Sequence, residues 1–292
     1  MENDPIALGL DIADDRMTEA SSARVGFRLG DKGTHTSRTI MLDELDLLFR
    51  ACGKDATRAS YREAIVVQNA LEKRTSATRR LSDQRLSELY ALDPTVVLFR
   101  VMRQLWDADE SGRPLLALLL ALARDPLLRM TAMSIIRMRT GDELGRQTFT
   151  DSLNRGTRSR FNESTLDKVV RNAASSWTQS GHLSGRSRKS RVTVNPTPAV
   201  VTYALLLGYA LGARGRVLFE TLWTKVLDAS HEQLVYLAMD AKRIGYLDLA
   251  ASGGVIEISL TRLLTDEERR LIHGSVVHFR NSALWRAASA SS

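Results

Sequence analysis

The sequence predicts a mainly α-helical protein that contains short β-hairpins. Apolar residues recur at helical spacing over most of the 292 residues. Two predicted helices end at glycines, Gly181 and Gly245, and strand-like alternation follows each of them. Aspartate-proline pairs such as Asp93-Pro94 and Asp125-Pro126 open further helices, because proline suits the first helical turn. These observations favour several small helical units, two of which carry a hairpin after their last helix.

The chain divides into five predicted segments. The acidic stretch 1–22 lacks apolar periodicity and is expected to be disordered. Residues 23–112 form a small helical domain in this division, and 113–198 and 199–275 form the two units with hairpins. The small residues that end the chain predict a mobile tail over 276–292.

Composition indicates a cytoplasmic protein with a polyanionic partner. The net charge is +7, and the isoelectric point near 9.8 favours a polyanionic partner, although nonspecific electrostatic binding fits these values equally well. Cys52 is the only cysteine, which excludes an internal disulfide and fits a reducing compartment. The start of the chain lacks the basic and apolar regions of a signal peptide. The longest apolar run, Leu115 to Ala123, is too short to cross a bilayer and is expected to be a buried helix, so no membrane partner is predicted.

The stretch from Phe161 to Pro196 is the most informative part of the chain. Ser164, with Asp167 three residues later, predicts a helix start, and Gly181 predicts its end. A shorter helix is expected from 142 to 154. The apolar stripe of the longer helix consists of Leu166, Val169, Val170, Ala173, Ala174 and Trp177. Its opposite, hydrogen-bonding face consists of Lys168, Arg171, Asn172, Ser175 and Gln179.

A basic hairpin follows this helix at once. Its cations are Arg186, Arg188, Lys189 and Arg191. Residues 151–198 contain nine Lys and Arg against three Asp and Glu, a net charge of +6. A helix that fits the major groove, followed by a cationic hairpin that meets phosphates, is the layout of a winged helix that binds double-stranded DNA. The same residues also fit a solvated helix face beside a mobile charged loop.

A second basic surface is predicted in the N-terminal domain. Three short helices, near 41–51, 57–71 and 75–91, have helix-turn-helix character. Residues 54–86 carry eight Lys and Arg against four Asp and Glu, a net charge of +4. The DNA-binding candidates here are Lys73, Arg74, Arg79 and Arg80. Ordinary ion pairs along the helix surface explain these charges equally well.

The C-terminal unit repeats the winged-helix pattern with a different charge. Ser230 and Gln233 predict a capping box, and the strand-like runs 246–250 and 255–260 predict a hairpin. Asp248 and Glu257 replace the cations of the first hairpin, so this unit is predicted to pack internally or to bind a partner protein, with Tyr236 as a contact. The predicted architecture is thus a small helix-turn-helix-like domain followed by two tandem winged-helix units.

Three segments of the chain resemble the BrxA family of BREX (bacteriophage-exclusion) systems. They read DKGTHTSRTIMLDELDLLFRA from Asp31, VVQNALEKRTSATRRLSDQRL from Val66, and ESTLDKVVRNAASSWTQSGHL from Glu163. The resemblance covers residues 25–200 approximately. The residues that match the second and third family motifs are Leu71, Lys73, Arg74, Thr75, Thr78, Ser164, Thr165, Lys168, Gly181 and Leu183.

The resemblance implies an all-helical, winged-helix protein that binds double-stranded DNA and serves phage defence without chemistry of its own. This chain departs from the family pattern by continuing into the second winged unit. That unit is a candidate contact for other proteins of the defence system.

The residues themselves also favour binding over catalysis. The five histidines are scattered, and none pairs with Cys52 or with carboxylates at metal-ligand spacing, so no metal or other cofactor is expected. Neither a nucleophile elbow nor a phosphate loop is present. Two other non-enzymatic functions fit the pattern: a dimeric winged-helix transcriptional regulator, and a protein–protein scaffold within a defence complex.

Overall fold

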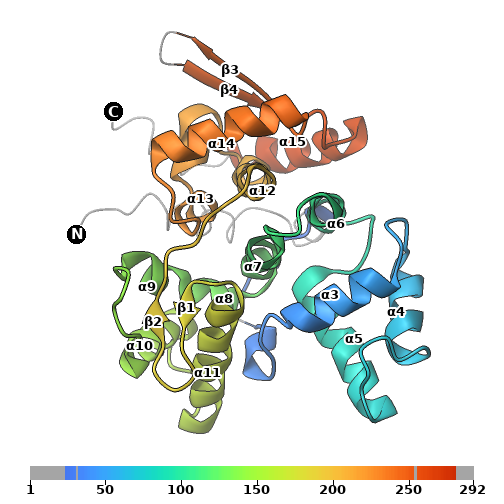
Figure 1. The fold of residues 1–292 in the computed structure, drawn as a ribbon, viewed down its shortest axis with the longest axis vertical. Helices are drawn as coiled ribbons and strands as arrows, with labels where there is room; N and C mark the ends of the chain where they lie inside the picture. Colours follow the sequence, from blue (N-terminus) through green and yellow to red (C-terminus); the bar gives the residue numbers. More distant parts are fainter. Residues whose placement is uncertain (1–23, 31, 253–254, 281–292) are drawn as a thin grey trace.

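The computed structural model describes residues 24–30, 32–252 and 255–280, which Figure 1 shows as three groups of helices packed on a shared core. The predicted disordered segment 1–22 lies outside the described residues. α15 (Asp266–Arg280) extends into the predicted tail segment 276–292 as far as Arg280. Residues 281–292 of that predicted tail lie outside the described part.

The N-terminal group is built from helices that begin at polar capping residues. Thr57 and Ser60 form a reciprocal capping box at the start of α4. The side chain of Thr75 accepts a hydrogen bond from the Thr78 N–H and caps α5, which begins where a helix near 75–91 is predicted. The elements are η1 (Thr34–Thr36), α3 (Leu42–Ala51), α4 (Arg58–Val66), α5 (Ser76–Tyr90), α6 (Val97–Ala108) and α7 (Arg113–Arg124).

The middle group contains the predicted long helix and the first hairpin. The helix that Asp125-Pro126 opens is interrupted at Thr131, whose hydroxyl donates to the Leu128 carbonyl and accepts from Trp177 Nε1 at 2.8 Å. The elements are α8 (Pro126–Met130), α9 (Ala132–Arg137), α10 (Arg146–Thr157), α11 (Glu163–Gln179), β1 (Leu183–Ser184) and β2 (Ser190–Arg191). β1 and β2 are antiparallel, with Leu183 opposite Arg191.

The C-terminal group repeats this order. The capping box of Ser230 and Gln233 starts α14, and Gly245 ends it with a φ of 92°, as predicted. β3 and β4 form the predicted antiparallel hairpin, with Asp248 opposite Ser259. The elements are α12 (Pro198–Ala210), η2 (Gly215–Glu220), α13 (Leu222–Lys225), α14 (His231–Ile244), β3 (Asp248–Ser252), β4 (Val255–Ser259) and α15 (Asp266–Arg280).

Two helices that are apolar all round form the centre of the molecule. Every residue of α7 from Leu115 to Arg124 is buried, which confirms the prediction of a buried helix for the longest apolar run. α12 is buried over nearly its whole length and packs on α6 and α7. In Figure 1 these helices lie between the three groups. The core is therefore continuous, and the groups are held in fixed relation to one another by shared apolar contacts.

The fold class is mainly helical, as predicted. The described residues contain thirteen α-helices and two small antiparallel hairpins. α11, β1 and β2 lie at the same end of the molecule as α4 and α5 in Figure 1, and α14, β3 and β4 lie at the opposite end. The helices that carry the two predicted basic surfaces therefore lie in the same half of the molecule.

Candidate nucleic-acid interface

α11 begins two residues earlier than the sequence predicts. The N-cap is Asn162, whose side chain accepts a hydrogen bond from the Thr165 N–H at 2.9 Å, so Ser164 is already inside the helix. At the other end Gly181 has a φ of 87°, the left-handed conformation that the glycine stop requires. The predicted apolar stripe is buried, and its Trp177 is fully enclosed. α11 is therefore a helix with one anchored face.

A third backbone segment joins the hairpin that follows α11. Residues 142–145, which the sequence predicts as helix, are extended instead, and α10 begins at Arg146. Glu143 lies opposite Ser190 in a bridge, and the Leu144 N–H donates to the Lys189 carbonyl at 2.8 Å. The prediction fails here because β2 supplies backbone partners from about fifty residues further along the chain. The unit thus contains a small ladder of three segments.

The polar face of α11 is divided between two surroundings. Asn172 Nδ2 donates to the His35 carbonyl at 2.8 Å. Gln179 Oε1 accepts from the Leu42 N–H at 3.1 Å, and its Nε2 donates to Thr39 Oγ1 at 3.0 Å. Both amides are half-buried against the N-terminal segment. The structure therefore corrects the assignment of Asn172 and Gln179 as base-reading residues: their hydrogen-bonding groups hold residues 35–42 on the helix.

A buried network anchors the same segment more deeply. His35 Nδ1 lies 2.8 Å from Asp125 Oδ2, and His35 Nε2 lies 2.8 Å from Ser176 Oγ. Burial by itself would raise the pKa of Asp125, but the neighbouring His35 and several N–H donors outweigh burial and lower it. The Asp125 carboxylate also accepts the Thr34 N–H at 2.6 Å and the Leu127 N–H at 2.9 Å.

The order Ser176, His35, Asp125 has the spacing of a nucleophile, a base and an orienting acid, yet its surroundings are those of a structural network. All three residues are at most 1% exposed, so a substrate cannot reach the hydroxyl. The Ser176 hydroxyl also accepts the Ile40 N–H at 2.9 Å and lies 2.8 Å from the Asn172 carbonyl. These contacts saturate its oxygen. The network joins the N-terminal segment to the start of α8, through Asp125, and to the buried face of α11, through Ser176.

The exposed part of the polar face lies beside the hairpin. Lys168 and Arg171 are exposed, and Ser175 is half-buried. Arg186 and Arg188 are exposed on the loop between β1 and β2, and Arg188 is 4.0 Å from Glu143 in a solvent-exposed pair that holds it weakly. The predicted cations therefore divide into an exposed set and an engaged set.

Lys189 connects the hairpin to the helix. Its Nζ donates to Thr178 Oγ1 at 2.8 Å and to the Gly185 carbonyl at 3.3 Å. Thr178 is one turn beyond Ser175, so the hairpin loop lies against the exposed side of the polar face. Gly185 has a φ of 108°, and a Cβ there would be 2.0 Å from the Arg188 carbonyl oxygen, so this turn requires glycine.

Arg191 is a buried clamp, which corrects its assignment as a phosphate contact. It is 4% exposed and forms an ion pair with Asp228. Its Nε also donates to the Ile135 carbonyl at 3.1 Å. Asp228 accepts the Val194 N–H at 3.1 Å with its other oxygen. Arg191 therefore joins the hairpin to the C-terminal group.

Two of the four DNA-binding candidates on the second predicted basic surface are exposed. Lys73 is half-buried and pairs with Glu44 at 3.0 Å, and Arg79 Nε donates to the Lys73 carbonyl at 3.2 Å. These contacts give Lys73 and Arg79 structural partners at the turn before α5. Arg74 and Arg80 are exposed. The available charge on this surface is therefore smaller than the sequence suggests.

The third helix of the C-terminal group offers a different surface. On α14, Tyr236 is 64% and Met239 52% exposed, on the face that corresponds to the polar face of α11. Arg243 pairs with Asp240 on the same helix, and Asp248 of the hairpin pairs with Arg262 at 2.9 Å. Cations are thus balanced by anions on this surface.

Neither a metal-holding cluster nor a membrane-spanning helix occurs among the described residues. No group of three or more His, Cys, Asp and Glu side chains in this part of the chain could hold a metal ion. No helix within the described ranges is both long and apolar enough to cross a bilayer. No family model and no curated protein matches the chain.

Proposed function

We propose that the protein binds double-stranded DNA without catalysing a reaction, as a cytoplasmic component of a BREX-type phage-defence system. The observation that carries this proposal is the position of four exposed cations. Lys168 and Arg171 lie on α11, and Arg186 and Arg188 lie on the β1–β2 loop, which contacts the C-terminal end of the same helix through Lys189 and Thr178. A helix and a flanking cationic loop on one side of a unit suit a duplex.

We interpret residues 126–194 as a winged helix. The order of elements supports this interpretation: α8 and α9, a short ladder segment, α10, α11 and the β1–β2 hairpin. α10 and α11 form the helix-turn-helix pair in this arrangement, and the hairpin loop is the wing. The order α12, α13, α14, β3, β4 supports the same interpretation for the C-terminal group.

In this proposal the N-terminal half of α11 enters the major groove. Lys168 and Arg171 point toward base edges or flanking phosphates, and Ser175 is a further donor or acceptor at the edge of the contact. Arg186 and Arg188 contact phosphates across the groove. Asn172 and Gln179 take no part, because their amides hold the N-terminal segment.

Arg74 and Arg80 extend the proposed interface. They belong to the α4–α5 pair, which lies at the same end of the molecule as α11 in Figure 1. Together with the four cations of the middle group and Lys189, they give enough charge for roughly four to six phosphate contacts, which corresponds to a slope of log Kobs against log salt concentration of about −4 to −5.

The test is a salt titration of binding to a labelled duplex of mixed sequence, followed by fluorescence anisotropy. The variant carries alanine at Lys168, Arg171, Arg186 and Arg188. We expect its slope to be shallower by about 3 to 4, since each lost phosphate contact removes about 0.9 from the slope. If the protein binds no duplex at low salt, the proposal is refuted, and the alternative function as a protein–protein scaffold is favoured.

A matched control distinguishes binding through a specific interface from binding driven by the net charge of the whole protein. It carries alanine at four positions of the C-terminal group: Arg216, Arg243, Arg262 and Arg270. These substitutions remove the same total charge as those of the first variant. We expect the control to keep the wild-type slope. Equal losses in both variants would show that net charge alone drives binding, and would remove α11 and its hairpin from the interface.

A further inference from the structure

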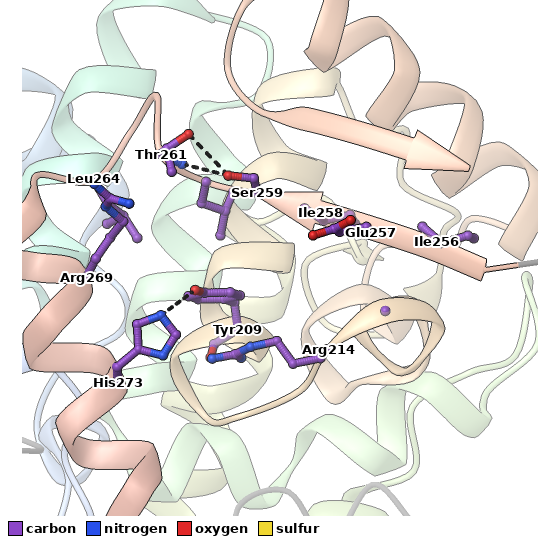
Figure 2. A pocket seen from close by; sticks show the side chains of 12 residues that line it. Tyr209, Arg214, Ile256, Glu257, Ile258, Ser259, Thr261, Leu264, Arg269 and His273 are labelled. Carbon is purple, nitrogen blue, oxygen red and sulfur yellow. Dashed lines mark hydrogen bonds between the residues drawn. The ribbon is translucent and has the colours of Figure 1, made fainter. Parts of the chain in front are cut away.

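A cavity of about 410 Å³ lies between β4, α15 and the segment that precedes η2 (Figure 2). Sites that hold a small molecule have volumes of roughly 300 to 1,000 Å³, so the cavity has the size of such a site. α12 contributes Tyr209 to its lining, the segment before η2 contributes Arg214, and α15 contributes Arg269 and His273. In Figure 1 β4 and α15 lie in the opposite half of the molecule from α11, so this cavity is separate from the proposed nucleic-acid interface.

The main chain around the cavity is already paired or covered. β4 pairs with β3 on one side. The segment before η2 lies against its other side, where a Cβ on Gly215 would be 3.2 Å from the Ile256 carbonyl oxygen. Beyond β4, the Leu260 carbonyl accepts the N–H groups of Leu263 and Leu264, both at 3.0 Å. A ligand of this cavity is therefore recognised by side chains and not by a strand edge.

Positive charge predominates in the lining of the cavity. Arg214 and Arg269 are opposed there by one carboxylate, that of Glu257, which is exposed on β4. Arg269 also pairs with Asp266, but the Asp266 side chain is 78% exposed, so water weakens this pair, and the guanidinium has further N–H donors. His273 lies one turn beyond Arg269 on α15, which places both side chains on the same wall. The lining therefore favours an anion.

Two pairs of polar groups in the lining each keep a donor. His273 Nε2 lies 3.2 Å from the Tyr209 hydroxyl, and this contact uses one proton (Figure 2). Whichever group donates that proton, a second N–H or O–H of the pair is left for another acceptor, because neutral imidazole and phenol carry one proton each. The hydroxyls of Ser259 and Thr261 lie 3.1 Å apart and keep one O–H in the same way. The cavity can thus donate hydrogen bonds to several oxygens of one ligand.

The walls that carry these donors are held in place by contacts within the protein. Arg100 of α6 pairs with Glu268 through two contacts of 2.6 Å and donates to the Leu263 carbonyl at 2.6 Å, which fixes the start of α15. The guanidinium carbon of Arg214 is 3.6 Å from the centroid of the Tyr209 ring, and Arg214 Nη1 donates to the Tyr209 carbonyl at 2.7 Å. Groups that are positioned before a ligand arrives lower the entropic cost of binding it.

We infer that the cavity binds a small phosphate monoester that carries a flat apolar group. A monoester phosphate has three terminal oxygens and a charge of about −1.5 to −2 at neutral pH, so it can accept from the arginines and from both polar pairs at once, whereas a carboxylate offers only two oxygens. The side chains of Ile256, Ile258 and Leu264 supply an apolar surface beside these donors, on which the rest of the ligand packs. The inference does not depend on DNA binding by the middle group.

The test measures binding of 4-methylumbelliferyl phosphate to the full-length protein by fluorescence anisotropy. Two other derivatives of the same fluorophore are compared with it: the sulfate monoester, which has a single negative charge, and the neutral glucoside. We expect the phosphate to bind about ten-fold more tightly than the sulfate, and the glucoside not to bind. If the phosphate shows no saturable binding at millimolar concentrations, or if the glucoside binds as tightly as the phosphate, the inference is overturned.

Variants and a competitor locate the bound phosphate. Arg269→Gln is expected to weaken binding of the phosphate probe about ten-fold, since a hydrogen bond between two charged groups is lost. Arg270→Gln changes the next residue, which is exposed and outside the cavity lining, and this matched control is expected to bind as the wild type does. Excess duplex should not displace the probe. Equal losses in the two variants, or displacement by duplex, would contradict the assignment of the site. A protein that binds the probe but no duplex would refute only the proposed function.

Discussion

His182 is buried at the junction between the middle and C-terminal groups, and its protonation should set part of the stability of that junction. Its Nε2 lies 2.7 Å from the Val226 carbonyl and its Nδ1 lies 2.9 Å from Ser180 Oγ. The Trp177 ring meets the imidazole edge-on at a centroid distance of 5.0 Å. Burial lowers the pKa of His182 to about 4, against the opposing effect of the Val226 carbonyl.

The sign of the pH dependence follows from this lowered pKa. The unfolded chain takes up a proton at this histidine near its ordinary pKa of about 6.5, whereas the folded protein does not until about pH 4. Stability from neutral His182 is therefore complete above pH 6.5 and is lost as the pH falls toward 4. Between about pH 7 and about pH 5 the loss is about 2 kcal/mol, at 1.36 kcal/mol for each pH unit over about one and a half units.

The assay is urea unfolding at the two pH values, followed by tryptophan fluorescence, for the wild type and His182→Gln. Glutamine keeps a donor for the Val226 carbonyl but does not titrate. We expect the free energy of unfolding of the variant to fall by about 2 kcal/mol less than that of the wild type between about pH 7 and about pH 5.

His231→Gln is the matched control for this measurement, because His231 is only half-buried and packs on Phe219. We expect it to keep the wild-type pH dependence. If the wild type and His182→Gln lose the same free energy on acidification, His182 is not held neutral, and the burial argument fails.

Three further results are expected from the contacts described. Asn172→Ala should keep duplex affinity within about two-fold but lower the free energy of unfolding by about 1 kcal/mol, because it loses the bond to the His35 carbonyl; a large loss of affinity at unchanged stability would restore Asn172 to the interface. Asp228→Asn should destabilise the protein by about 3 kcal/mol in urea unfolding, since it leaves the Arg191 charge buried without its partner, and a neutral result would contradict the clamp. Burial raises the pKa of the Cys52 thiol, so a thiol reagent should label it only at the rate of unfolding, and rapid labelling of the native protein would contradict its burial.

The local elements follow largely from nearby residues. The start of the helix near residue 75, the capping box at Ser230, the glycine stops at Gly181 and Gly245, and the second hairpin are where the sequence predicts them. Each depends on hydrogen bonds within about four residues or on the backbone freedom of one glycine, so a single sequence contains the necessary information. The buried helix at Leu115 follows for a similar reason, because its composition admits no exposed face.

Which polar residues remain available to a ligand was decided by the tertiary structure. Helical spacing places Lys168, Asn172 and Gln179 on one face, but residues 35–42, more than a hundred positions away in the chain, cover the side that carries the two amides. Arg191 has the composition of a wing cation and becomes a buried clamp because Asp228 of the next group lies against it. Periodicity defines the faces of a helix, whereas the packing of distant segments determines which face stays in contact with water.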